Sequence, residues 1–335
     1  MGRLVGKRQY RELLLALGLL CAALALVLWP GEAMGAMRDG LKLCGNVIVP
    51  SLFPFFVLSS LVVELGMSRY LGRLFQPVMA PLFRVNGACA SALALGFVGG
   101  YPVGARTAIS LYQSGQCSKT EAERLLAFCN NSGPAFIFGV VGAGIFGSGA
   151  LGLLLYLVHM AASLLVGLLF RFYRPGEGPR SGRLQGVQFQ TASFPTAFTH
   201  SVTEALASTL NICAFVLFFM IALRLLSFTG ALHLLSAALA ALLAPFGMTE
   251  HLACALFAGF LEVSTGSACL QGAPLTAGTA ALAAFLLGWG GLSVHCQSLL
   301  FLVETDLSCR PYFLGKFLQG LLSALLAFLW FSLAI

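Results

Sequence analysis

Four short polar, glycine-rich segments interrupt an otherwise apolar chain, and together they could form a binding site. In chain order they are GFVGGYPVGAR (96–106), FCNNSGP (128–134), GFLEVSTGS (259–267) and GGLSVHCQ (290–297). Gly259 follows Gly96 by 163 residues. Ser293 follows Ser132 by 161, so both halves keep the order and spacing of the segments, which indicates a duplication. Polar helix breaks at bilayer depth mark the substrate path in transporters, so we expect these segments to line one.

The polar side chains of these segments are the expected ligand contacts. A broken helix exposes N–H groups that carry about half a positive charge, and carbonyls without partners, so it can bind an anion or an amide-rich ligand. The predicted substrate-binding residues are Tyr101, Arg106, Asn130, Asn131, Ser132, Glu262, Ser264, Thr265, Ser293, His295 and Gln297. Alternatively, the uncharged residues only satisfy backbone groups freed by glycine and proline, and Tyr101 shapes a hairpin tip.

Arg106 and Glu262 carry charges inside apolar surroundings. A charge near the bilayer centre costs about 2.5 to 3.5 kcal/mol, so each residue needs a partner or a water-filled cavity. Arg106 could neutralise a substrate carboxylate, pair with Glu262, or extend to the cytoplasmic mouth. Glu262 could take a coupling proton or sodium ion, hold a sugar-like hydroxyl, or bond to the hairpin backbone. His295 could titrate during proton coupling, or fix a turn as a neutral donor.

Enzyme chemistry is not indicated by the sequence. It contains no HExxH, GxSxG or Walker A motif, and Ser293 with His295 in one short segment does not make a triad. The ten cysteines show no CxxC spacing, and most lie in apolar runs as small hydrophobic residues. We therefore expect no catalytic residues, no metal site, no cofactor and no disulfide framework.

The composition requires a membrane environment. Hydrophobic residues make up 59% of the chain and charged residues 9%, with a mean hydropathy of +0.91, which excludes a soluble globule. A spanning helix takes about 20 apolar residues, and several stretches reach that length, so the predicted fold class is an all-α polytopic membrane protein. The net charge of +7 comes mostly from short segments between apolar runs, which indicates lipid rather than nucleic acid as the partner.

The apolar runs divide the chain into two similar halves. Residues 1–35 are predicted as an N-terminal transmembrane helix, with a cleaved signal peptide as the alternative, because the apolar run is longer than the roughly 7 to 15 residues of a signal peptide's core. Residues 40–170 and 201–335 form two repeats, each with an interfacial segment, a re-entrant helical hairpin, a broken transmembrane helix and a plain closing helix. The hairpins are expected near 87–113 and 251–282, and the broken helices near 121–146 and 278–303.

Lysine and arginine orient this layout, because short cytoplasmic loops are enriched in both. The rule places the N-terminus in the cytoplasm, together with the inter-repeat linker 171–200. It also places Arg310 and Lys316 on that side. The first helices of the two repeats then run in opposite directions, so the repeats are predicted to be inverted.

Five motifs carry a resemblance to a known family. PSLFPFF, GFVGGYPVGA, FCNNSGP, LEVSTG and GGLSVHCQ resemble segments of the YlbJ-type sporulation integral membrane proteins, and the resemblance covers about residues 40–320. These proteins belong with the nucleoside-recognition or Gate domains, which look like the core of concentrative nucleoside transporters. The resemblance implies an inverted repeat of hairpin plus broken helix, and export of dipicolinic acid from the mother cell across the outer forespore membrane.

These observations predict a secondary transporter of a small polar or anionic solute in the bacterial inner membrane or the outer forespore membrane. Dipicolinate is the first choice of substrate. A nucleoside transporter is the alternative with the same mechanism, and a membrane scaffold that recruits sporulation partners through residues 171–200 is the alternative from another class. The coupling ion, the direction of transport and a homo-oligomeric state are left open.

Overall fold

The structure, a computed structural model, describes residues 2–65, 67–175 and 193–334. Every regular element in these ranges is a helix. Among the described residues, four helices are long and apolar enough to cross a membrane, or up to six if each of two sharply bent helix pairs counts as one span. The all-α, multi-pass fold class predicted from the sequence is confirmed.

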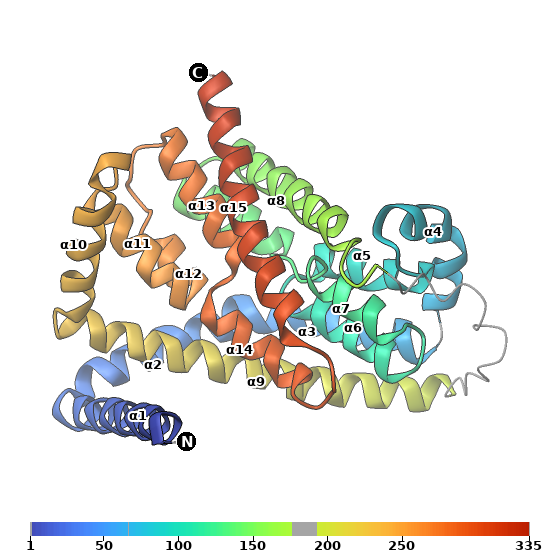
Figure 1. Cartoon of the computed structure of the whole chain (residues 1–335), viewed down its shortest axis with the longest axis horizontal. Coiled ribbons are helices and arrows are strands. Elements are labelled where there is room, and N and C mark those ends of the chain that lie inside the picture. The colour runs from blue at the N-terminus through green and yellow to red at the C-terminus, as the bar shows by residue number, and fades with distance from the viewer. Residues whose placement is uncertain (1, 66, 176–192, 335) are drawn as a thin grey trace.

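The first half contains eight α-helices in its described residues (Figure 1). They are α1 (Gly2–Leu28), α2 (Pro30–Leu43), α3 (Val49–Glu64), α4 (Ser68–Phe83), α5 (Ala90–Gly99), α6 (Val103–Gln113), α7 (Lys119–Leu126) and α8 (Gly149–Phe170), with shorter helices η1 (Cys44–Ile48), η2 (Gly87–Cys89) and η3 (Ala135–Ile145). Local signals set several ends. Ser118 and Glu121 form a reciprocal capping box that starts α7.

The second half has an order of elements similar to that from α3 to α8, without counterparts of α1 and α2. It contains α9 (Phe194–Phe228), α10 (Ala231–Leu243), η4 (Ala244–Phe246), α11 (Glu250–Leu261), α12 (Val263–Ala268), α13 (Ala277–Trp289), α14 (Gly291–Leu302) and α15 (Cys309–Ala334). Thr249 and Thr276 cap α11 and α13 through their side-chain oxygens. The pair α5 and α6 corresponds to α11 and α12, and the segment from α7 to η3 corresponds to α13 and α14.

Glycines let the two arms of each hairpin approach closely. A Cβ on Gly96 would lie 3.2 Å from the Cα of Gly104, and a Cβ on Gly266 would lie 2.1 Å from the Cα of Gly259. Helix backbones meet this closely only where both carry small residues. The two halves therefore use glycine for the same purpose at matching places.

The helices form two sets with different directions (Figure 1). Helices α13 and α15 pack along one another, and α8 packs beside α15. Helix α9 crosses below them in this view and packs against α2 and α3. At 35 residues, α9 is about 50 Å long, well beyond the roughly 30 Å of a hydrocarbon core. Helix α9 is therefore a long supporting helix that extends beyond the thickness of a hydrocarbon core.

Several element boundaries differ from those expected. The predicted helix over 1–35 ends at Leu28, where the chain bends by 93° into α2. Residues 194–200, assigned to the linker, form the first turns of α9 instead, while 176–192 lie outside the described residues. Helix α9 therefore begins closer to the N-terminus than the polar composition of the linker indicated.

Candidate functional site

The two hairpin turns and the two helix breaks meet around a small cavity, here called the tip cavity. Its volume is about 110 Å³. Five of the predicted site residues line it: Tyr101, Ser132, Glu262, Ser264 and Gln297. Gly100 and Gly133 also line it, and a Cβ on Gly100 would lie 2.8 Å from the backbone nitrogen of Gly133. Gly100 has φ +81°, so both conformation and space require glycine at this turn.

Glu262 stabilises the second hairpin. One carboxylate oxygen accepts from the backbone N–H of Ser264 at 3.0 Å, and the other accepts from the backbone N–H of Thr265 at 2.7 Å and from its hydroxyl at 2.9 Å. The side chain is thus the N-cap of α12, at the edge of the cavity. This is the backbone-bonding alternative considered for Glu262, and it accounts for Thr265 as well.

Arg106 lies away from the tip cavity. The pairing with Glu262, one of the alternatives considered for Arg106, is not formed, because Glu262 bonds to its own hairpin and the Arg106 guanidinium bonds to Glu204 at 2.8 Å. The guanidinium also lies over the ring of Phe56, 5.3 Å from its centroid. Arg106 and Glu204 line a separate cavity of about 270 Å³, together with Glu304. Arg106 is therefore placed beside a second, more polar chamber.

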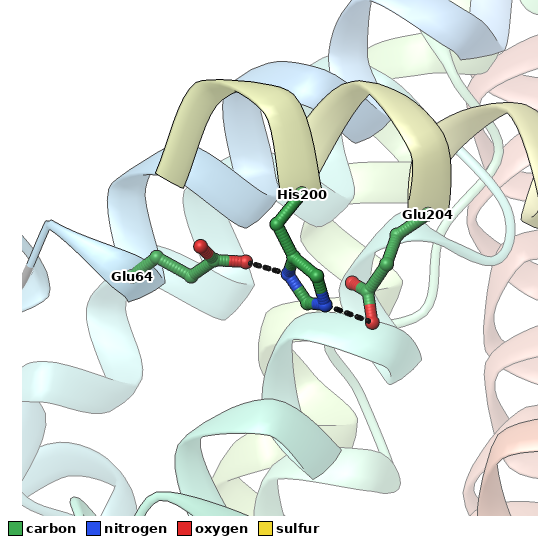
Figure 2. Close-up of side chains that lie close together, drawn as sticks. All are labelled: Glu64, His200 and Glu204. Atoms are coloured by element: carbon green, nitrogen blue, oxygen red, sulfur yellow. Dashed lines mark hydrogen bonds and ion pairs between the residues drawn. The ribbon is translucent and has the colours of Figure 1, made fainter. Parts of the chain in front are cut away.

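Glu204 belongs to a row of three ionisable side chains between α3 and α9 (Figure 2). His200 contacts Glu64 at 2.6 Å through Nδ1 and Glu204 at 3.6 Å through Nε2. The three ligand-type atoms lie within 4.8 Å of one another, a spacing that could hold a metal ion. The guanidinium of Arg106 already places a positive charge beside the carboxylate of Glu204.

The first break is held by side chains from the second half. Asn130 donates to Ser298 at 3.0 Å and to Tyr312 at 3.3 Å, and Asn131 accepts from Gln319 at 2.7 Å. Asn131 and the amide nitrogen of Asn130 are bonded within the fold, whereas the Oδ1 of Asn130 is buried without a partner among the described residues, and neither asparagine lines the tip cavity. Ser132 does line it, and among the described residues its buried hydroxyl has no hydrogen-bond partner.

The second break is a glycine pair with polar residues on its far side. Gly290 and Gly291 both have positive φ, +86° and +82°, which ends α13 and restarts the chain as α14. Gln297 donates to Ser293 at 3.2 Å and lines the tip cavity. His295 contacts the Tyr312 hydroxyl at 2.9 Å and packs edge-on against a tryptophan ring, so it lies behind the cavity.

Sequence reasoning missed the polar residues of α8 and α15 that brace this site. Lys316, expected on the cytoplasmic side, is fully buried and donates to the carbonyl of Asn130 at 2.7 Å. Gln319 and His159 are buried beside it. The signal was present, because Lys316 and Gln319 are three residues apart and share one face of an otherwise apolar helix. The count of positive charges treated Lys316 only as a cytoplasmic charge, so the face that it shares with Gln319 was overlooked.

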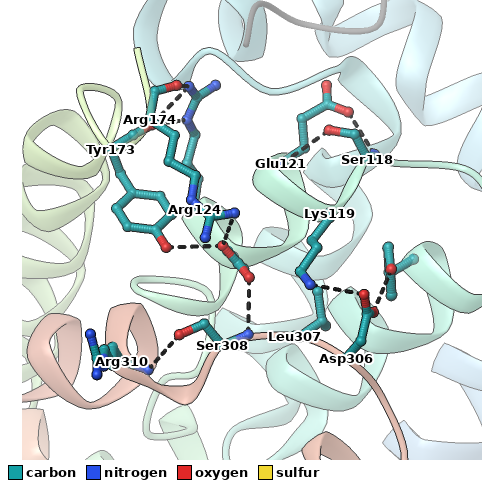
Figure 3. Close-up of polar contacts among 12 residues, drawn as sticks. Ser118, Lys119, Glu121, Arg124, Tyr173, Arg174, Asp306, Leu307, Ser308 and Arg310 are labelled. Carbon is teal, nitrogen blue, oxygen red and sulfur yellow. Dashed lines mark hydrogen bonds and ion pairs between the residues drawn. The ribbon is translucent and has the colours of Figure 1, made fainter. Parts of the chain in front are cut away.

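A second polar network joins the two halves away from the cavity (Figure 3). Arg124 is buried and donates to the backbone carbonyls of Arg84, Tyr173 and Arg174 at 2.7 to 3.0 Å. Its neighbour Glu123 accepts from the backbone N–H of Ser308, just before α15, at 2.9 Å. At the exposed edge, hydrogen bonds from Lys119 and then from Tyr112 lower the pKa of Asp306.

Helices that break around a small, mostly apolar cavity, in a chain with several candidate spans among its described residues, are those of a multi-pass helical membrane protein. A family model described as Gate, nucleoside recognition, matches residues 47–174. The sporulation integral membrane protein YlbJ of Bacillus subtilis is 33% identical over 317 residues, which cover 90% of this chain and 78% of that protein. The chain belongs to the family of YlbJ-type sporulation integral membrane proteins. No solved structure matches it.

Proposed function

We propose that the protein is a secondary transporter whose small solute binds in the tip cavity. The observation that carries this proposal is the Ser132 hydroxyl, which has no partner among the described residues and is buried where both hairpin turns and the first break meet. A buried polar atom without a partner costs free energy, so its retention favours a bound solute as its partner. The hairpins would be re-entrant, and the two repeats inverted across the membrane.

Dipicolinate is the substrate that these features favour. A cavity of about 110 Å³ is smaller than the roughly 300 to 1,000 Å³ of sites for drug-sized ligands, which suits a single-ring solute. The relative in Bacillus subtilis is named as a sporulation protein, which favours a solute moved during sporulation across the outer forespore membrane. The carboxylate of Glu262 accepts three hydrogen bonds, two of them from backbone N–H groups. Its negative charge is therefore already stabilised when an anionic solute binds beside it.

A nucleoside is the second candidate, and two observations favour it. The matching family model is described by nucleoside recognition. Glu262 and Gln297 both line the cavity, and carboxylate and amide groups can bond the hydroxyls of a sugar. The scaffold alternative depends on the linker, of which residues 176–192 lie outside the described residues.

Removing the Ser132 hydroxyl tests the site. We expect Ser132→Ala in proteoliposomes to lower the initial rate of labelled dipicolinate flux roughly tenfold, which corresponds to one hydrogen bond of about 1.4 kcal/mol. Its melting temperature should not fall, because the hydroxyl has no partner in the described fold. Ser323→Ala is the matched control, because that hydroxyl is equally buried and unpartnered but lies outside the cavity.

The same assay run with labelled uridine separates the two solutes. Uridine flux without dipicolinate flux would show that a nucleoside is the substrate, and the transport proposal would stand. Flux of neither solute in the wild type would contradict the transport proposal, and equal flux in Ser132→Ala and Ser323→Ala would remove the cavity as its site.

A further inference from the structure

A lysine lies in the centre of the fold, directly behind the tip cavity. Lys316 is on α15 and its side chain is fully buried. Its amino group is 2.7 Å from the carbonyl oxygen of Asn130, 2.7 Å from the side-chain oxygen of Gln319 and 3.3 Å from the hydroxyl of Tyr101. These three groups come from the first break, from α15 itself and from the first hairpin turn.

The hydrogen-bond geometry favours the ammonium form of Lys316. The Tyr101 hydroxyl donates its own proton to the carbonyl of Leu287, so its oxygen accepts from Lys316. Three acceptors therefore face one nitrogen. An ammonium group has three N–H donors to match them, whereas a neutral amine has only two and a lone pair that would face an oxygen.

This positive charge has no counter-ion in the described chain. Lys316 takes part in none of the ion pairs found among the described residues. Glu262 is bonded to its own hairpin. His159 accepts the backbone N–H of Ser132 through Nε2, at 3.0 Å, so it is a neutral imidazole and adds no charge.

Tyr101 connects the buried charge to the cavity. Its ring lies beneath the ammonium group, 4.8 Å from nitrogen to ring centroid, and the same residue lines the tip cavity. Only one side chain therefore separates an uncompensated positive charge from the solute. Between buried charges in a medium of low dielectric constant, attraction is screened much less than in water.

We propose that Lys316 is the specificity-determining residue that makes the tip cavity select a carboxylate-bearing solute over a neutral one. The inference rests on the proposed function for the place of binding. Lys316 acts as a positioning residue, because it touches the break and the hairpin turn rather than the solute. An anion in the cavity supplies the missing counter-charge, and a neutral ring of the same size does not.

Binding by the purified full chain tests this directly, with ligand-induced shifts of the melting temperature as the readout. We expect dipicolinate to raise the melting temperature of the wild type, and the uncharged pyridine-2,6-dicarboxamide to have less effect. In Lys316→Met, which keeps the length of the side chain without its charge, the apparent affinity for dipicolinate should fall at least tenfold while that for the dicarboxamide does not. Lys119→Met, at an exposed lysine, should bind as the wild type does.

A second pair of variants keeps the test informative if Lys316→Met folds poorly. Lys316→Ala leaves room for a soluble amine, so added propylammonium should restore dipicolinate binding in that variant, whereas propanol should not. Unchanged preference for dipicolinate in Lys316→Met, or equal rescue by propanol, would overturn the role of the charge. Because binding is measured without flux, this result is separate from the transport assay, which alone decides whether the protein is a carrier.

Discussion

Gly104→Ala is expected to destabilise the protein by more than about 3 kcal/mol, at the upper end of the cost of overpacking a core. A Cβ at this position would lie 1.9 Å from the carbonyl oxygen of Cys129 and 3.1 Å from the Cα of Gly96. All of these obstacles are backbone atoms, so no side-chain rotation can relieve the clash. The first hairpin would have to move away from the first break, which would also open the tip cavity.

The melting temperature of the purified protein measures this effect, with Gly35→Ala as the control. Gly35 is in helix α2 and has no atom within 4 Å of its added Cβ. Alanine there should be neutral or stabilise the protein by up to about 1 kcal/mol, because it restricts the unfolded chain. Equal melting temperatures for the two variants would show that the hairpin does not pack on the break as described.

Arg124→Met is expected to cost about 3 to 5 kcal/mol of stability. The guanidinium satisfies three backbone carbonyls, at the end of α4 and after the end of α8, and methionine fills part of the space without donating to any of them. A buried acceptor left without a donor costs about 1 to 3 kcal/mol, and these three are partly buried, so their summed cost lies below the full amount. Limited proteolysis should then cut the chain earlier near Tyr173 and Arg174, because their carbonyls lose this anchor.

Arg310→Met provides the matched control, because Arg310 lies on the exposed side of the same network. Its replacement should change stability by no more than about 0.5 kcal/mol, as for other exposed positions. If Arg124→Met and Arg310→Met had the same melting temperature, the Arg124 guanidinium would not be anchoring the chain after α4 and after α8.

The sequence predicted the kinds and order of elements well, because their causes are local. Runs of apolar residues predicted the helices, and glycine with proline predicted the turns at Gly100 and the break at Gly133. The pairing of glycines, Gly96 with Gly104 and Gly259 with Gly266, follows from the repeat once the hairpins are known. Their contact distances do not, because they depend on how tightly the arms pack.

Partners of the charged residues were less predictable, because they depend on which helices come together. For Arg106 a substrate carboxylate, Glu262 and the cytoplasmic mouth were the alternatives, whereas its carboxylate partner is Glu204 on α9. Lys316 was counted by the charge rule among the cytoplasmic charges, although its side chain is fully buried on an apolar helix. A rule about loops cannot detect a lysine whose oxygen partners come from distant segments.

The bracing of the first break by α15 has a consequence for biosynthesis. Asn130 and Asn131 are made early, but several of their partners, Tyr312, Lys316 and Gln319, are on the helix that follows all the others in this sequence. Domains generally fold from the N-terminus during synthesis, so the nascent first half enters the membrane with these polar groups still unpaired. Until α15 inserts, these groups lack the partners that it carries, so we expect water or other polar groups to solvate the break.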